Sequence, residues 1–132
     1  MALVVTFEAL EECDLDQWLE KQKAREGGGH TIRCAHCGHT VSTTDQRIEQ
    51  AGAHTHVFTN PAGITFEIGC FRHAPGCETI GESTLKHTWF PGHAWSIGAC
   101  GGCRTHLGWA FGPGATGDAF HGLILSRLAE EN

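Results

Sequence analysis

The chain has 132 residues, a length that fits one domain with a modest hydrophobic core. Its apolar fraction of 40% is ordinary for a globular protein, and 18 glycines against 4 prolines favour turns and short strands over long helices. The formal net charge is −6 and the sequence contains no basic patch, which argues against nucleic-acid binding.

No apolar run approaches the length that crosses a membrane, so we expect no membrane partner. The opening MALVVTF is too short for a secretory signal and no basic region precedes it. The chain has 7 cysteines, an odd number, and four of them form two CxxC pairs. These features predict a cytoplasmic protein.

Residues 1–26 are predicted to form a separate helical extension. Leu15, Trp18 and Leu19 fall at helical spacing, and Asp14 or Asp16 could cap the start of the helix. Two interpretations of this helix stay open. It either has no binding role, and then packs on the domain or frays in solvent, or it binds a partner. The GGGH sequence that follows is a flexible break, and the main domain is expected over residues 30–128.

The main domain is predicted to be mostly β. Its runs are short, rich in β-branched and aromatic residues, and separated by turn signals. The expected strands lie at 31–34, 39–43, 56–60, 64–71, 87–90, 93–99 and 106–111. The run 120–128 fits either a strand or a short helix. Residues 60–63 and 90–93 have the composition of tight turns.

The strongest motif is a pair of CxxC sequences, Cys34/Cys37 and Cys100/Cys103, far apart in the chain. Two thiolates separated by two residues can reach one tetrahedral ion from a tight turn. Such turns need positive φ angles and free backbone N–H groups near sulfur, and glycines stand at positions 38, 101 and 102.

These four cysteines predict one structural Zn²⁺ per chain that joins two distant hairpins. Four thiolates leave no open coordination position for a substrate water. The competing interpretations are a redox dithiol and a pair of disulfides. A redox CxxC usually opens a helix after a strand, and no helical pattern follows Cys37 or Cys103.

The remaining cysteines, Cys13, Cys70 and Cys77, have no assigned role. A buried free thiol is the simplest interpretation of Cys70, which sits between apolar residues. Cys70 and Cys77 flank a short turn, so a second weak metal or disulfide site stays open. His54 and His56 fall on one strand face as a minimal metal pair, but no third ligand is near in sequence.

Three tryptophans, Trp89, Trp95 and Trp109, gather around the second CxxC pair. Trp109 and Phe111 are two residues apart and therefore share a strand face. If the Pro-Gly turn folds back on their strand, the three indoles can form the walls of a box for a flat ligand. The alternative is an ordinary hydrophobic core. Ile97 is the only branched aliphatic residue between Trp89 and Cys103, which favours the box.

The run HTWFPGHAWSIGACGGCRTHLGWAF resembles the ligand-binding region of the CULT domain family, the cereblon-like thalidomide-binding domains. The resemblance extends over roughly residues 30–128 and includes CAHCG, FTNPAG, both CxxC pairs, HLGWAF and the closing F-x-GLI segment. It implies a β-tent fold, in which two antiparallel sheets are pinned by a zinc ion held by four cysteines.

The resemblance also implies a cage for a cyclic imide. Ligands of the family include glutarimides such as thalidomide, uridine, and protein C-termini cyclised to an imide. The three tryptophans would form the cage, the backbone of residues 87–89 would face the imide edge, Phe111 would close the base and Asn60 would lie at the rim. The ligand-binding residues implied in this way are Asn60, His87, Thr88, Trp89, Trp95, Trp109 and Phe111.

The leading prediction is therefore a binding module and not an enzyme. The first alternative is a methionine sulfoxide reductase of the B type, a class that resembles this fold and also uses two CxxC pairs for zinc. Such an enzyme needs a nucleophilic cysteine on a late strand, and no cysteine follows Cys103.

A second alternative is an aromatic-cage reader of methylated ammonium groups, although no acidic residue lies within 87–109. A zinc module that acts only through protein contacts is a third.

Larger members of the family carry a further domain that docks to a ubiquitin ligase. The 132 residues leave no space for it, so ligase docking is not expected. The oligomeric state and the physiological ligand stay open.

Overall fold

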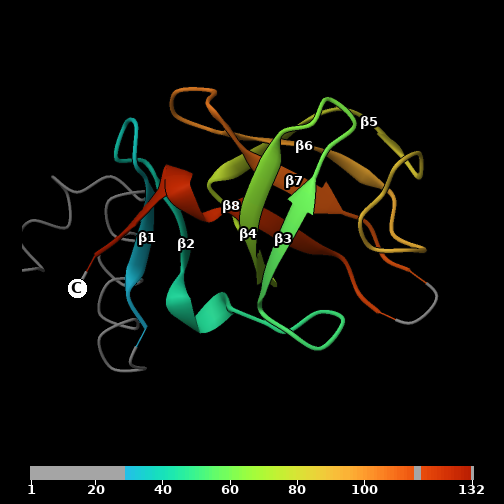
Figure 1. The fold of residues 1–132 in the computed structure, drawn as a ribbon. Coiled ribbons are helices and arrows are strands. Elements are labelled where there is room, and N and C mark those ends of the chain that lie inside the picture. Colours follow the sequence, from blue (N-terminus) through green and yellow to red (C-terminus); the bar gives the residue numbers. More distant parts are fainter. Residues whose placement is uncertain (1–28, 115–116, 132) are drawn as a thin grey trace, which may run out of the picture.

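The computed structural model describes residues 29–114 and 117–131, which fold into two antiparallel β-sheets (Figure 1). The prediction of a mostly β protein with two antiparallel sheets is confirmed. The predicted helical extension at 1–26 and Cys13 lie outside the described residues. Within the described ranges, no helix has the length and apolar character needed to cross a bilayer.

The smaller sheet has three strands in the order β2-β1-β9. Strand β1 (Thr31–Cys34) and strand β2 (Thr40–Thr43) form a hairpin that encloses the first CxxC pair. Strand β9 (Leu128–Glu130) pairs with the other edge of β1, so the end of the described chain returns to its beginning. A short 3₁₀ helix, η1 (Thr44–Gln46), leads out of this sheet.

The larger sheet has six strands in the order β3-β4-β8-β7-β6-β5. Its members are β3 (Thr55–Thr59), β4 (Thr65–Phe71), β5 (Cys77–Thr84), β6 (Trp95–Cys100), β7 (His106–Phe111) and β8 (Phe120–Ile124). All neighbouring strands run antiparallel. The second CxxC pair lies in the β6–β7 connection, and the 3₁₀ helix η2 (Leu125–Arg127) carries the chain from β8 to the smaller sheet.

Local sequence chemistry explains the two predicted turns, and both are confirmed. The N–H of Gly63 donates to the carbonyl of Asn60, and the N–H of His93 donates to the carbonyl of Phe90. Gly63 has φ 87° and Gly92 has φ 91°, a left-handed conformation that glycine adopts without steric cost.

One strand prediction is wrong, and one strand, β5 (Cys77–Thr84), was not predicted. The run 87–90 is a turn and not a strand, because His87 adopts a φ of 61° that reverses the chain. Strand β5 carries no apolar alternation, since almost all its side chains are exposed at the edge of the sheet. The ambiguous run 120–128 divides into β8, the short helix η2 and the beginning of β9.

The buried side chains form two clusters. One lies between the two sheets beside the four cysteines and includes Ile32, Val41 and Leu107. The other lies under the larger sheet and includes Phe90, Trp109, Phe111 and Phe120. Trp109 and Phe111 therefore belong to the hydrophobic core as well as to the aromatic group that the sequence singled out.

The centre of the larger sheet requires a glycine at position 108. A Cβ atom there would lie 2.0 Å from the carbonyl oxygen of Gly122 on the neighbouring strand. We expect Gly108→Ala to reduce the free energy of unfolding by about 1–3 kcal/mol, because the strands must separate to admit the methyl group. Chemical denaturation measures this change. Gly98→Ala is the matched control, since its nearest atoms would be 3.6 Å away; an equal loss in both variants would contradict the explanation.

Candidate metal centre and aromatic cavity

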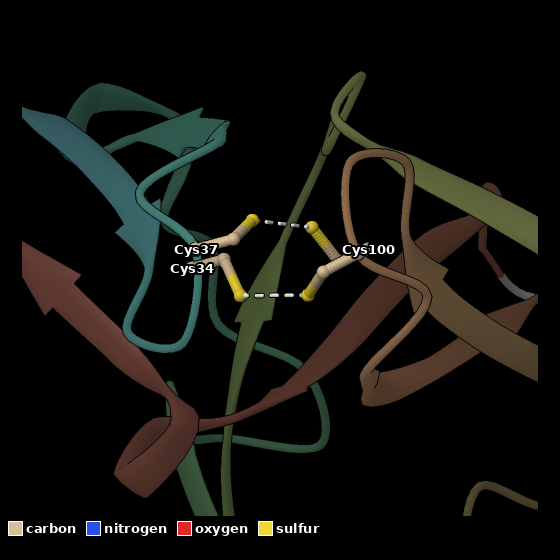
Figure 2. Close-up of side chains that lie close together, drawn as sticks. Cys34, Cys37 and Cys100 are labelled. Carbon is tan, nitrogen blue, oxygen red and sulfur yellow. Dashed lines mark hydrogen bonds between the residues drawn. The ribbon is translucent and has the colours of Figure 1, made fainter.

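The two CxxC pairs meet in space although they come from different sheets (Figure 2). The sulfur atoms of Cys34, Cys37, Cys100 and Cys103 all lie within 4.8 Å of one another. Cys34 Sγ is 3.8 Å from Cys103 Sγ, and Cys37 Sγ is 3.6 Å from Cys100 Sγ. A tetrahedral ion with Zn–S bonds of about 2.3 Å requires sulfur atoms about 3.8 Å apart. The four thiols therefore fit one tetrahedral metal ion.

Both pairs sit in turns with the same backbone pattern. The N–H of Gly38 donates to the carbonyl of Cys34, and the N–H of Arg104 donates to the carbonyl of Cys100, each at 2.8 Å. Gly38 and Arg104 both have left-handed φ angles, 81° and 69°. The expectation of positive φ is correct for Gly38 but wrong for the glycines at 101 and 102, because the second turn uses Arg104 instead.

Hydrogen bonds to sulfur favour the thiolate form of Cys103. The Thr105 hydroxyl lies 3.0 Å from Cys103 Sγ and lowers the pKa of that thiol to about 6. The pKa of Cys37 moves the other way: a backbone hydrogen bond at His39 lowers it, but burial and the neighbouring thiols outweigh that bond and raise it to about 12. The N–H of Gly102 donates to Cys100 Sγ at 3.3 Å. Since metal ligands must be deprotonated, these contacts prepare the site for a cation.

The remaining described cysteines do not belong to the metal centre. Burial raises the pKa of Cys70 to about 11 and that of Cys77 to about 12, so both stay neutral thiols. Both histidines of the minimal metal pair are occupied by backbone carbonyls, His54 by Ile48 and His56 by Gln50 and Ala53. In the described part of the chain, the four-cysteine cluster is the one group that could hold a metal ion.

A cavity of about 530 Å³ lies beside the larger sheet, and its walls are largely aromatic. We call it the aromatic cavity. Its aromatic walls are Phe66, Trp89, Trp95, Trp109 and Phe111. This volume falls in the range of sites that bind drug-sized molecules, about 300–1,000 Å³.

One face of the β6–β7 pair forms the floor of the aromatic cavity. Trp95 lies opposite Phe111 and Ile97 lies opposite Trp109 in the antiparallel register, and all four line the cavity. Alternate residues of a strand point to the same side, so two strands suffice to place these side chains together. The expectation that Trp109 and Phe111 share a face agrees with this register.

The three indoles do not stack on one another. The rings of Trp89 and Trp109 meet edge to face, with centroids 4.7 Å apart and planes at 71°. Trp89 is held in place by Phe58, on which it stacks at 4.8 Å. Among the described aromatic rings Trp95 forms no stacked or edge-to-face pair with either of the other two indoles, although it packs against the cluster that includes Trp109 and Phe111.

The turn at 86–88 is fastened to the cavity wall. Trp95 Nε1 donates to the carbonyl oxygen of Lys86 at 2.7 Å, and the Thr88 hydroxyl donates to the carbonyl of His93 at 2.6 Å. Among the described residues, the main-chain groups of His87 and Trp89 make no hydrogen bond. The left-handed backbone of His87 is a conformation that a non-glycine residue adopts at a cost. The turn thus holds unpaired backbone donors and acceptors beside the cavity.

The predicted ligand-binding residues are brought together with one exception. Asn60, His87, Trp89, Trp95, Trp109 and Phe111 line the aromatic cavity. Thr88 does not line it, because its hydroxyl is turned toward His93. The carboxamide oxygen of Asn60 accepts from the N–H groups of Ala62 and Ile64, so this part of the side chain maintains the β3–β4 turn.

The predicted ligand-binding set lacks six further lining residues, which are Pro61, Ile64, Phe66, Ile97, His106 and Arg127. Three of these add an aromatic or charged group to the wall. Phe66 lies opposite Phe58 in the β3–β4 register, and its alternate position in the run 64–71 was the available signal. His106 is half-buried; burial lowers its pKa, and the nearby Arg127 charge lowers it further. Arg127 comes from η2, whose position no local pattern predicted.

Comparisons with known proteins agree with this arrangement. No family model matches the chain. Cereblon of Danio rerio is 32% identical over 83 residues, which are 61% of this chain and 19% of that protein. Cereblon of Drosophila melanogaster is 31% identical over 104 residues, 72% of this chain and 17% of that protein. Cereblon of Xenopus tropicalis matches at 32% over 83 residues.

The chain spans less than a fifth of the length of these curated relatives, 19% and 17% for the Danio rerio and Drosophila melanogaster proteins. What it shares with them is therefore one domain and not the whole protein. The chain is thus a cereblon-like protein, and its described part is a domain of the CULT type, the C-terminal domain of cereblon.

Proposed function

We propose that this protein is a binding module for cyclic imides, which it takes into the aromatic cavity, and that a structural zinc ion holds the fold together. The observation that carries the proposal is a cavity of about 530 Å³ whose lining includes three non-stacked indoles. The ligand class comprises glutarimides, thalidomide-type compounds, uridine-like molecules and protein C-termini cyclised to an imide. The flat ring of such a ligand can pack against the flat faces of the aromatic walls.

The turn at 86–88 supports the choice of an imide over other flat ligands. An imide presents an acceptor, a donor and an acceptor along one edge, and the remaining ring atoms are apolar. The unpaired N–H and C=O groups of His87 and Trp89 offer the complementary donors and acceptors. The Asn60 and His87 side chains at the cavity add polar groups for the part of the ligand outside the ring.

Zinc is the metal that best suits the four-cysteine cluster. Soft thiolates in a tetrahedral arrangement select zinc or an iron centre, and a complete set of four leaves no position for substrate. The ion would link the β1–β2 hairpin to the β6–β7 hairpin, which begins and ends with cavity residues Trp95 and Phe111. A metal–thiolate centre needs reduced cysteines, which supports a cytoplasmic location.

The alternatives fit the cavity and the cysteines less well. A reductase of the methionine sulfoxide type needs a reactive thiolate, whereas the raised pKa values of Cys70 and Cys77 keep these thiols protonated. A reader of methylated ammonium groups needs a cavity that attracts cations. Among the described residues no carboxylate lines the aromatic cavity, and Arg127 places a positive charge there.

Calorimetric titration with glutarimide and with N-methylglutarimide tests the proposal. We expect glutarimide to bind with one site per chain and its N-methyl derivative to bind at least about tenfold more weakly. Methylation removes the single donor of the imide edge and leaves a backbone acceptor unpaired, which costs about 1–3 kcal/mol. Equal affinity for the two compounds, or no binding of glutarimide, would contradict the proposal.

A further inference from the structure

One positive charge at the aromatic cavity has no acidic partner among the described residues. Four other arginines of the described residues form ion pairs, Arg33 with Glu131, Arg47 with Glu130, Arg72 with Asp118 and Arg104 with Glu78. Arg127 is the exception in the described part of the chain, although it is half-buried and lines the cavity. A guanidinium withdrawn from water without an anion is electrostatically unfavourable.

The fold holds the Arg127 side chain in place at the wall. Its Nη1 donates to the carbonyl oxygen of His106 at 2.7 Å, and its Cζ lies 5.9 Å from the centroid of Phe66. The main chain is fixed as well, because the carbonyl of Arg127 accepts from the N–H of Ala35 at 3.0 Å. Guanidinium carries five N–H donors, so the contact with His106 leaves most of them for a ligand.

The cavity is larger than an imide ring requires. Its volume of about 530 Å³ suits a drug-sized molecule, of which the ring is one part. The imide-facing turn is fastened to Trp95 on β6, whereas Arg127 is packed against Phe66 on β4, and two strands separate β6 from β4 in the sheet. The unpaired charge and the turn therefore reach the cavity from different elements, Arg127 from η2 and His87 from the segment between β5 and β6.

We propose that Arg127 forms an oxyanion subsite of the aromatic cavity, so that the preferred ligand is a cyclic imide that also carries a carboxylate or phosphate group. This inference rests on the proposed function. The planar fork of arginine pairs with either group through two parallel hydrogen bonds. Phe66 and the His106 carbonyl keep the fork oriented before the ligand arrives, which lowers the entropy lost on binding.

Matched pairs of ligands test the subsite by calorimetric titration. The carboxylate pairs are 3-aminoglutarimide acylated with malonic, succinic or glutaric acid, each compared with its methyl ester. The phosphate pair is uridine 5′-monophosphate compared with uridine. We expect the charged member of at least one pair to bind about tenfold more tightly, and the preference to shrink as salt is raised. If only one pair shows the preference, that pair identifies the type of anion and the linker length between the imide ring and the anionic group that the subsite accepts.

The variant Arg127→Gln is expected to remove the preference, so that the charged and neutral members of each pair bind it with equal affinity. Arg127→Lys keeps the charge but loses the fork, so it should retain part of the preference. Metal content and thermal midpoint verify that the variants are folded. The wild-type comparison of charged with neutral ligands stands even if a variant does not fold.

The outcomes separate the two proposals. Neutral imides that bind while no charged member is preferred at any linker length would overturn the oxyanion subsite and leave imide binding intact. A preference that persists in Arg127→Gln would also overturn it. If neither charged nor neutral imides bind the wild-type protein, both proposals fail.

Discussion

Removal of the metal from the four-cysteine centre is expected to unfold the domain. The four thiols join the smaller sheet to the larger one, and the buried cluster beside them is small. Binding of a structural zinc ion to a four-ligand site supplies about 10–16 kcal/mol at neutral pH. This is comparable to the whole stability of a domain, about 5–15 kcal/mol, so the apo form should lose cooperative unfolding. Circular dichroism during titration with a chelator measures the transition.

A matched pair of cysteine variants separates the metal from the thiols. Cys100→Ser removes a ligand and should abolish stoichiometric zinc and the thermal transition. Cys77→Ala changes the residue that lies opposite Cys100 in the β5–β6 register but lies outside the metal cluster. It should retain one zinc per chain. If the chelated protein or Cys100→Ser unfolded at the wild-type temperature, the structural role of the metal would be refuted.

Truncation of Trp109 is expected to have the largest effect on ligand binding. Its ring contacts Trp89, Phe66 and His106 at centroid distances of 4.7, 5.2 and 4.8 Å, and only 8% of it is exposed. Trp109→Ala should therefore weaken glutarimide binding by about 2–4 kcal/mol, roughly thirty- to a thousandfold. The same change should cost about 3–5 kcal/mol of stability, because it leaves a cavity in the core.

Two controls distinguish lost binding from lost stability. Phe120 stacks on Phe111 and is buried, but it does not line the aromatic cavity. Phe120→Leu should lower the thermal midpoint while glutarimide affinity stays within about threefold of wild type, since less than 1 kcal/mol is then involved. Trp109→Phe keeps an aromatic wall and should bind better than Trp109→Ala. Equal affinity of wild type and Trp109→Ala would show that the indole is not part of the binding site.

The four-cysteine centre and Arg127, the residue of the proposed oxyanion subsite, are physically connected. The first CxxC turn binds the backbone of Arg127 through the N–H of Ala35, and the second turn leads directly into His106. Partial loosening of the metal centre is thus expected to affect the charged end of the cavity before the indole walls. A metal ion with four thiolate ligands would thus influence the preference for charged ligands through the position of Arg127, although no ligand binds to the metal.

Short-range chemistry determined much of the molecule. The CxxC spacing identified the four cysteines that cluster and could hold a metal ion, because two thiols on one tight turn must lie close together. The glycines at 63 and 92 specified two turns through their left-handed backbone. Period-two spacing placed Trp109 and Phe111 on one face. In each case the information lies within a few consecutive residues.

Only the tertiary structure decided which distant residues share the cavity. The alternate position of Phe66 indicates its strand face, but strand order is what brings it beside the tryptophans. His106 and Arg127 carry no local sign of their position, which depends on strand order and on the path of η2. Strand β5 exists because its backbone pairs with β6 at an edge, where exposed side chains impose no pattern. The composition of the run 87–90 predicts a strand, yet the chain reverses at His87. The hydrogen bond from Trp95 to the Lys86 carbonyl, a tertiary contact, holds this turn in place.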